Sequence, residues 1–205
     1  MRLHGSEDEF TVSLMPFLRA LLGDQPLFTL STAAGGELRV VGFSGEESLS
    51  GLFEFRLELA GAEVDLAAML DKPAVLKIDG VEAPRFVSGV ISAFEYVGQA
   101  RHLQLYEAQL VPWIWRLQHR HDCRVFQAKS TPDILKDVLV GAGLASEGFR
   151  FELLGEYAPR DYCVQYRESD LGFISRLMEE DGIFYFFEHE ADMHRLIMAD
   201  YVGAH

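Results

Sequence analysis

The sequence has few cysteines, few basic residues and no long hydrophobic run. Its two cysteines, Cys123 and Cys163, are too few for a disulfide framework or a four-thiolate metal site. With 18 basic and 32 acidic residues the net charge is −14, which opposes generic binding to nucleic-acid phosphates or anionic lipid. Apolar runs such as residues 183–187 are far shorter than the roughly 20 residues that span a bilayer.

The N-terminus also lacks the basic start of a secretory signal, because Glu7, Asp8 and Glu9 stand there instead. We therefore expect that the protein, if it leaves the cell, does so without a cleaved signal peptide. The length of 205 residues, 49% of them hydrophobic and 24% charged, predicts one large or two small folded domains with a sizeable core.

The chain divides into three segments by its pattern. Residues 1–26 are a leader extension with some helical spacing, to which we assign no function. Residues 27–115 predict an antiparallel β-barrel domain, and residues 116–205 predict an α+β segment. The expected fold class is therefore α+β with a β-dominated first half.

Period-two alternation carries the barrel prediction. The residues Phe53, Phe55, Leu57 and Leu59 alternate with charged ones, as in a strand with one wet face. The pair Asp79–Gly80 separates two further strands and indicates a hairpin. Short strands at this spacing, interrupted only by a helical turn at 66–70, favour a barrel or a sandwich.

The second half predicts two helices and a hairpin. We expect Thr131 to cap the first helix, which ends at Gly141 and Gly143. The second helix follows Ser169, stops at Gly182 and buries the apolar residues Leu171, Phe173, Ile174, Leu177 and Met178. Strands are expected at 183–188 and 194–199, and His189 and His194, which flank their turn, are expected to be solvated.

Two polar clusters could carry chemistry. If they lie on a strand, the side chains of His119, His121 and Cys123 share one face, and their nitrogen and sulfur atoms suit zinc. A structural zinc site needs four ligands and no fourth is adjacent in the sequence, so a polar strand edge is the favoured interpretation. The acids at 179–181 could be imagined as an acid/base pair, but a solvated helix end held by Arg176 is favoured. The motif patterns of common hydrolases and nucleotide-binding proteins do not occur in the sequence. We therefore expect neither an enzyme nor a cofactor, and Cys163 is expected to be a buried thiol.

Short motifs follow one another along most of the chain. The longest motif covers residues 160–187, and it continues in 188–190 and 194–200; the others are 43–50, 71–73, 85–90, 110–117, 123–127 and 130–134. The principal motif residues are Arg124, Phe126, Gln127, Gln165, Tyr166, Arg167, Glu168, Asp170, Phe173, Arg176, Leu177, Glu180 and Gly182. Each motif alone is weak, but their order along the chain is specific, and it closely resembles that of the VgrG spike proteins of type VI secretion systems.

The resemblance implies a phage-tail-hub fold that assembles as a homotrimer at the tip of a secretion tube. It also implies a tube protein (Hcp), a tip protein (PAAR) and cargo effectors as partners, no catalytic residues in this region, and export from the bacterial cytoplasm by the type VI machinery. Family members continue into more of the hub, an OB-fold domain and a β-needle. The chain is thus expected to be a fragment or a truncated product, which leaves its own trimerisation and tip binding open.

Three other functions stay open at this point. The nearest is a hub or late-control protein of a contractile phage or phage-like particle, which shares the fold and the assembly. A zinc-dependent hydrolase using His119, His121 and Cys123 is a distant alternative. A small cytosolic adaptor or chaperone-binding module made from a truncated hub is a further class.

Overall fold

The computed structural model describes residues 27–33, 37–79 and 83–204, and the expected leader, 1–26, lies outside them. The chain forms two compact units. Unit 1 holds the strands β1 to β6, and unit 2 comprises residues 47–53 together with everything from Val111 onward. Residues 47–53 thus belong to unit 2, although the expected barrel segment, 27–115, contains them.

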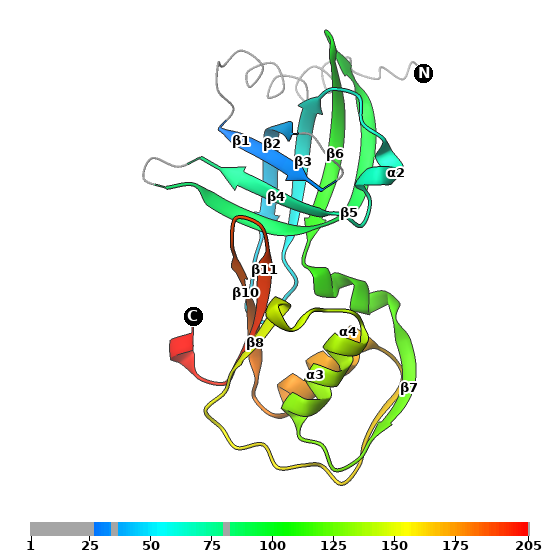
Figure 1. Ribbon diagram of the computed structural model, residues 1–205, viewed down its shortest axis with the longest axis vertical. Coiled ribbons are helices and arrows are strands. Elements are labelled where there is room, and N and C mark those ends of the chain that lie inside the picture. Colours follow the sequence, from blue (N-terminus) through cyan, green and yellow to red (C-terminus); the bar gives the residue numbers. More distant parts are fainter. Residues whose placement is uncertain (1–26, 34–36, 80–82, 205) are drawn as a thin grey trace, which may run out of the picture. The chain divides into compact units, whose positions relative to one another are not determined.

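Unit 1 is a closed six-stranded barrel with the order β1-β2-β3-β6-β5-β4 (Figure 1). Its strands are β1 (Phe28–Thr32), β2 (Glu37–Glu46), β3 (Glu54–Gly61), β4 (Pro73–Ile78), β5 (Arg85–Ala100) and β6 (Leu103–Val111). Every strand contributes buried apolar side chains, among them Leu30, Val40, Leu57, Leu76, Val87 and Leu110. The closed antiparallel barrel confirms the expected fold class, and closure leaves no unpaired strand edge.

Local sequence features explain the barrel connections. The alternation in β3 places Phe55, Leu57 and Leu59 inside, each no more than 6% exposed. The short helix α2 (Leu66–Met69) begins where the Asp65 side chain accepts a hydrogen bond from the Ala67 amide. Strands β4 and β5 pair antiparallel as the hairpin signal predicts.

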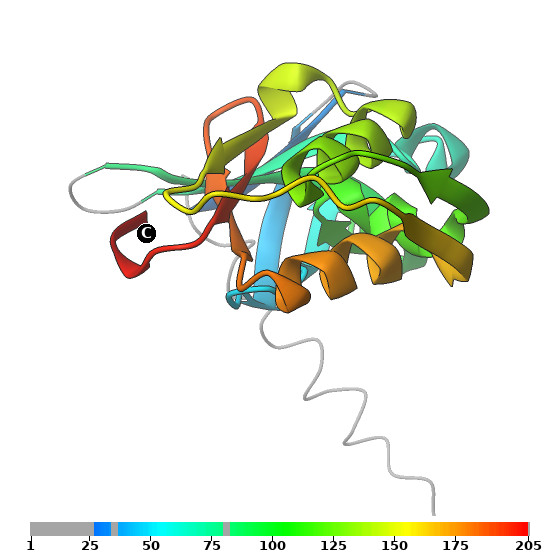
Figure 2. The same cartoon turned by 90° about the horizontal axis from the view of Figure 1, so that it is seen from below.

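Unit 2 packs two helices against two small sheets. Helix α3 (Thr131–Gly141) and helix α4 (Asp170–Glu180) lie side by side in both views (Figures 1 and 2). One sheet has the order β10-β11-β8, made of β10 (Phe184–His189), β11 (His194–Ala199) and β8 (Phe149–Glu152). The other is an antiparallel ribbon of β7 (His121–Phe126) and β9 (Cys163–Ser169).

Short 3₁₀ helices complete unit 2. They are η1 (Trp113–His119), η2 (Ser146–Gly148) and η3 (Val202–Ala204). Strand β8 runs parallel to β11, a pairing between distant segments that no local sequence pattern predicts.

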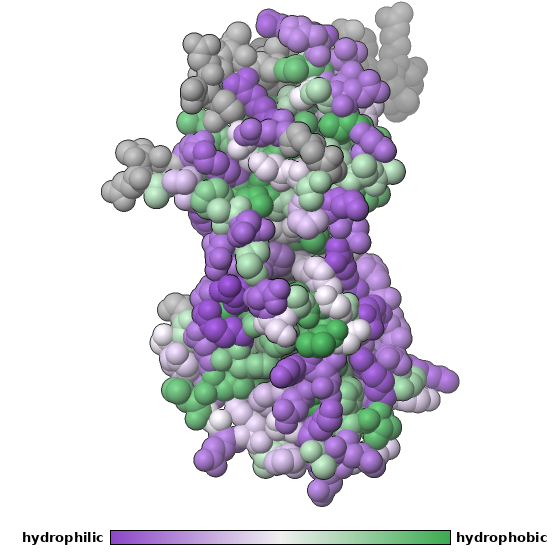
Figure 3. Space-filling model, in the orientation of Figure 1, coloured by the Kyte–Doolittle hydropathy of each residue, from purple (hydrophilic) through white to green (hydrophobic). Residues whose placement is uncertain are grey.

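On the face drawn in Figure 3, most of the surface is hydrophilic and the hydrophobic residues form separate spots.

The cap of α3 corrects one expectation. Ser130, not Thr131, is the N-cap: its hydroxyl accepts from the Asp133 amide, and the Asp133 carboxylate accepts from the Ser130 amide. Thr131 is 1% exposed instead, and its hydroxyl oxygen accepts a hydrogen bond from Arg160 Nε at 3.1 Å. The Thr131 hydroxyl, which the sequence predicts as the helix cap, therefore binds Arg160, a residue distant in the sequence.

The second helix follows its prediction. Ser169 caps α4 by accepting from the Gly172 amide at 3.0 Å. Phe173, Ile174, Leu177 and Met178 are at most 2% exposed, and Leu171 packs partly buried against the same core. Gly182 follows the helix with φ 69°, a left-handed conformation that glycine adopts without strain.

Candidate functional site

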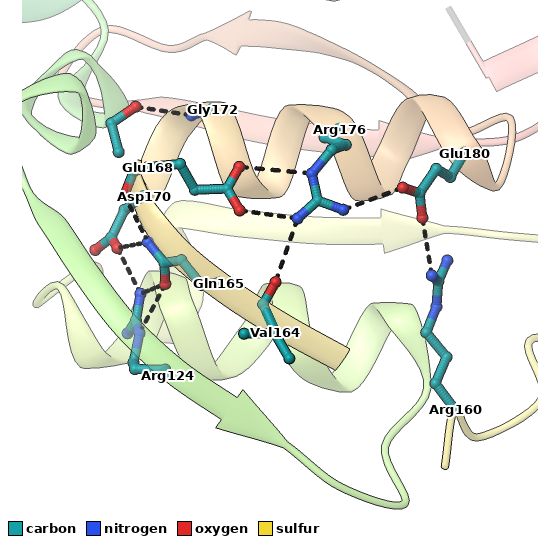
Figure 4. A network of polar contacts seen from close by, with 10 residues as sticks. Arg124, Arg160, Val164, Gln165, Glu168, Asp170, Gly172, Arg176 and Glu180 are labelled. Carbon is teal, nitrogen blue, oxygen red and sulfur yellow. Dashed lines mark hydrogen bonds and ion pairs between the residues drawn. The ribbon is translucent and has the colours of Figure 1, made fainter. Parts of the chain in front are cut away.

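The residues of the predicted family motif gather in unit 2, where β7, β9 and α4 meet (Figure 4). Their polar members form two connected groups, one centred on Asp170 and the other on Arg176.

Asp170 is the buried centre of the first group, at 1% exposure. Its Oδ1 accepts hydrogen bonds from Arg124 Nη2 and, at 2.8 Å, from Gln165 Nε2. Its Oδ2 lies 3.2 Å from Arg120 Nε, a charge contact without hydrogen-bond alignment. The Asp170 amide also donates to the Arg120 carbonyl at 2.7 Å. One carboxylate thus ties the first residue of α4 to β7, β9 and the end of η1.

Gln165 completes this group. It is fully buried, and its Oε1 accepts from both Nε and Nη2 of Arg124, at 2.9 and 2.7 Å. Its Nε2 donates to Asp170 and, at 3.1 Å, to the Glu168 carbonyl. Every polar atom of the Gln165 amide therefore has a hydrogen-bond partner, whereas Oδ2 of Asp170 in the same network has a charge contact alone.

The second group runs along α4. Arg176 Nη2 donates to Glu168 Oε1 at 2.8 Å and to the Val164 carbonyl at 3.4 Å, and its Nη1 donates to Glu180 Oε1 at 3.1 Å. Arg160 Nη1 reaches the other oxygen of Glu180 at 2.8 Å. The hydrogen bond from Arg160, followed by that from Arg176, lowers the pKa of Glu180.

The expected acidic helix end is therefore held by basic partners. Arg176 pairs with Glu180 as the spacing predicts, and Arg160 additionally pairs with Asp181 at 3.0 Å. Sequence reasoning missed Arg160, because it lies in a loop about twenty residues before its partners.

The remaining motif residues are structural or lie on the surface. Phe126 and Phe173 stack with ring centroids 5.6 Å apart, and Leu177 is fully buried beside them. Gln127 is exposed, as are Tyr166 and Arg167, whose guanidinium lies 5.2 Å from the Tyr166 ring centroid. Arg167 has φ 53°.

The three candidate zinc ligands do not share a strand face. His119 ends η1 and packs its ring 4.7 Å from that of Trp115, whereas His121 and Cys123 lie on β7. A register shift between Asp122 and Cys123 further breaks the alternation that would align them. Across residues 27–33, 37–79 and 83–204, no group of three or more possible metal-ligating side chains converges.

The two cysteines differ in environment. Cys163 is buried in β9, as expected, and burial raises the pKa of its thiol. Cys123 is exposed on β7.

His189 and His194 are not solvated as predicted. They pair across β10 and β11, and both are partly buried. His194 Nε2 accepts a hydrogen bond from the Trp113 amide at 2.9 Å, and His189 Nε2 lies 2.7 Å from Glu47 Oε1. Burial, followed by the neighbouring His189, lowers the pKa of His194 from 6.5 to about 4. The signal was missed because the covering segment, residues 47–53, is far away in the sequence.

The barrel wall carries a shallow hollow of about 670 Å³ over β2, β3, β5 and β6. Glu58, Glu95 and Glu107 line it, and Glu58 and Glu107 face each other across β3 and β6. Burial, and secondarily the charge of Glu107, raises the pKa of Glu58. Arg56 also lines this hollow, so its lining carries charged side chains of both signs. Over the described part of the chain, no helix is long and apolar enough to cross a membrane.

Comparison with known proteins identifies relatives over most of the chain. The model of the phage tail baseplate hub (GPD) family matches residues 46–205. The type VI secretion spike protein VgrG1c of Pseudomonas aeruginosa is 37% identical over 174 residues, which is 82% of this chain and 23% of that protein. The actin cross-linking toxin VgrG1 of Vibrio cholerae is 37% identical over 175 residues, 80% of this chain and 16% of the toxin.

A solved structure shares the fold. An Escherichia coli component of the type VI secretion system, itself similar to the bacteriophage T4 tail proteins gp27 and gp5, superposes with a TM-score of 0.79 at 25% identity. The match covers 86% of this chain and 50% of that one. The chain spans about a quarter or less of the length of the curated relatives it matches.

Proposed function

The chain belongs to the phage tail baseplate hub family, and on that premise we propose that it is a structural part of a type VI secretion spike. In this role it forms hub structure that caps the secretion tube and helps to deliver effectors. The observation that carries the proposal is the identity of 36–39% to P. aeruginosa spike proteins, over 78% of the chain or more.

The geometry supports a mechanical rather than a catalytic role. The barrel closes on itself, and the central polar groups of unit 2 bind one another. Asp170 and Gln165 are directed at Arg124 rather than into a cleft. Internal bonding of this kind, within each unit taken by itself, suits a structural part rather than a catalyst. We assign no reaction to this segment, and the toxin activity of the V. cholerae relative is not carried over, because the match covers only 16% of that protein.

The proposed assembly is a homotrimer in the complete spike, in contact with the tube protein Hcp, the tip protein PAAR and effectors. The proposed route begins in the bacterial cytoplasm and leads out through the type VI machinery without a signal peptide. The family membership and the named spike relatives support this assembly and this route.

A segment exchange tests the proposal. Residues 46–205 would replace the matching segment of P. aeruginosa VgrG1c, and release of the tube protein into the medium would be measured. We expect release with the exchanged segment and with an added Glu179→Asp change, because Glu179 is exposed. Leu177→Asp, which places a charge in the core, should abolish release. A folded, trimeric chimera that releases no tube protein would contradict the proposal.

A phage tail hub is the second candidate, favoured by the name of the matching family and by the T4-like structural relative. The two functions differ in the tube that the chain binds. Purified chain would be mixed with hexameric Hcp and, separately, with the tube protein of a contractile phage, and complexes would be measured by sedimentation. Selective binding to Hcp supports the spike, and selective binding to the phage tube supports the hub.

A further inference from the structure

The segment that covers the edge of β10 is residues 47–53, which we call the latch. The latch belongs to unit 2, although it links β2 to β3, two strands of unit 1. The Ser50 amide donates to the Tyr185 carbonyl at 2.8 Å, so the latch pairs with the outer edge of β10. An uncovered edge strand offers unpaired amides and carbonyls to other chains, and the latch therefore protects this sheet from strand addition.

Phe53 anchors the latch. It is fully buried, and its ring lies close to those of Phe187, His189 and His194, with centroid separations of 5.1, 4.9 and 5.7 Å. Two of these three rings are titratable. Phe53 thus packs against two imidazole rings, one of them that of His194.

His194 holds its position as a neutral acceptor. Nε2 must carry a lone pair to accept the hydrogen bond from the Trp113 amide, which is 2.9 Å long. A protonated imidazole has no lone pair on either nitrogen. A proton on Nε2 would turn this hydrogen bond into a contact between two donors, leave the Trp113 amide unsatisfied and bring a charge against the Phe53 ring. Each consequence disfavours the closed arrangement.

The charged and titratable groups near His194 lie on β10, on β11 and in the latch. His189, on β10, would repel a charged His194 when it is itself protonated. The carboxylate of Glu47, in the latch, lies 2.7 Å from His189 Nε2. On β11 itself, Arg195 pairs with Glu190 and Glu188.

From this geometry we propose that the latch is an acid-sensitive cover, which protonation of His194 releases from the edge of β10. When the latch is released, the outer edge of β10 is exposed and Phe53 loses its contacts with the rings of Phe187, His189 and His194. The rest of unit 2 keeps its fold. The pH range in which this occurs lies below neutrality, because burial lowers the pKa of His194 to about 4.

The test follows the Ser50 amide by hydrogen exchange, corrected for the intrinsic effect of pH, between pH 7.5 and 4. The reference is the Ala142 amide, which bonds to the Val138 and Leu139 carbonyls at the end of α3 and reports on the fold of unit 2. In the unaltered full chain we expect protection of Ser50 to fall at least tenfold on acidification while that of Ala142 changes less than threefold. Unchanged protection of Ser50, or a parallel loss at both amides, would overturn the proposal.

Two matched variants assign the effect. His194→Gln keeps a side-chain acceptor for the Trp113 amide but does not titrate, so protection of Ser50 should become independent of pH. His189→Gln removes the neighbouring histidine and should retain the acid response. A response that persists in His194→Gln would refute the assignment. If that variant does not fold, the unaltered chain provides the test. The pH midpoint of the His194 imidazole titration, measured by NMR, must coincide with the pH midpoint at which the Ser50 amide loses protection, and a mismatch refutes the proposal.

Discussion

The buried carboxylate of Asp170 offers the sharpest test of what holds unit 2 together. Asp170→Ala leaves the guanidinium of Arg124, 24% exposed, and that of Arg120, 44% exposed, without their shared buried anion. Removing one partner of a buried ion pair typically costs about 3–5 kcal/mol. Arg124 keeps a second carboxylate, that of Asp122 at 3.3 Å, so we expect a loss near the lower end, about 3 kcal/mol.

The matched control is Asp122→Ala. Asp122 contacts the same arginine, but its side chain is 48% exposed, and exposed pairs contribute about 0–1 kcal/mol. The free energy of unfolding would be measured in urea by the fluorescence of Trp113 and Trp115, the chain's two tryptophans, both in unit 2. Equal losses in the two variants, or a loss under about 1 kcal/mol for Asp170→Ala, would refute the reasoning that burial sets the strength of this contact.

Four further outcomes are expected. Leu177→Ala should cost about 2–5 kcal/mol in urea unfolding, whereas exposed Glu179→Ala should change stability by about 0.5 kcal/mol or less; equal effects would show that the buried face of α4 is misassigned. The pKa of His194 is 6.5 in the unfolded chain and about 4 in the folded protein, so the unfolded chain binds the proton more readily. The stability that neutral His194 contributes is therefore complete above pH 6.5 and declines as the pH falls towards 4. That contribution, up to about 3.5 kcal/mol at roughly 1.4 kcal/mol per pKa unit, should be missing from the pH–stability curve of His194→Gln. The isolated chain should not form a stable trimer at micromolar concentration, because three copies carry 3 × −14 = −42; light scattering that finds a salt-independent trimer would contradict this. Metal analysis should find no stoichiometric zinc; zinc at about one per chain that His121→Ala removes would revive the hydrolase hypothesis.

Family recognition and element type followed from the sequence because their causes are local. The alternation around Phe55 and Leu57 identifies a half-buried strand whichever strands flank it. Ser169 and Gly182 mark the ends of α4 because a cap and a left-handed glycine act within one turn of the helix.

The candidate site was predicted only in part. The motif residues and the pair between Arg176 and Glu180 could be read from spacing alone. The sequence did not indicate that Asp170 is buried, because a charged residue in a first helical turn ordinarily faces water. Its burial depends on Arg124 and Gln165, which arrive from two other strands.

The sequence by itself determined the family, the barrel strands and the buried face of α4, since propensity, periodicity and capping act over a few residues. Only the tertiary structure decided that Thr131 serves Arg160 instead of a helix cap, that β8 joins β11 in parallel, and that residues 47–53 cross to unit 2 to enclose His194. These choices rest on contacts between segments dozens of residues apart, whose free energy exists only when both segments are in place. No local pattern can encode that condition.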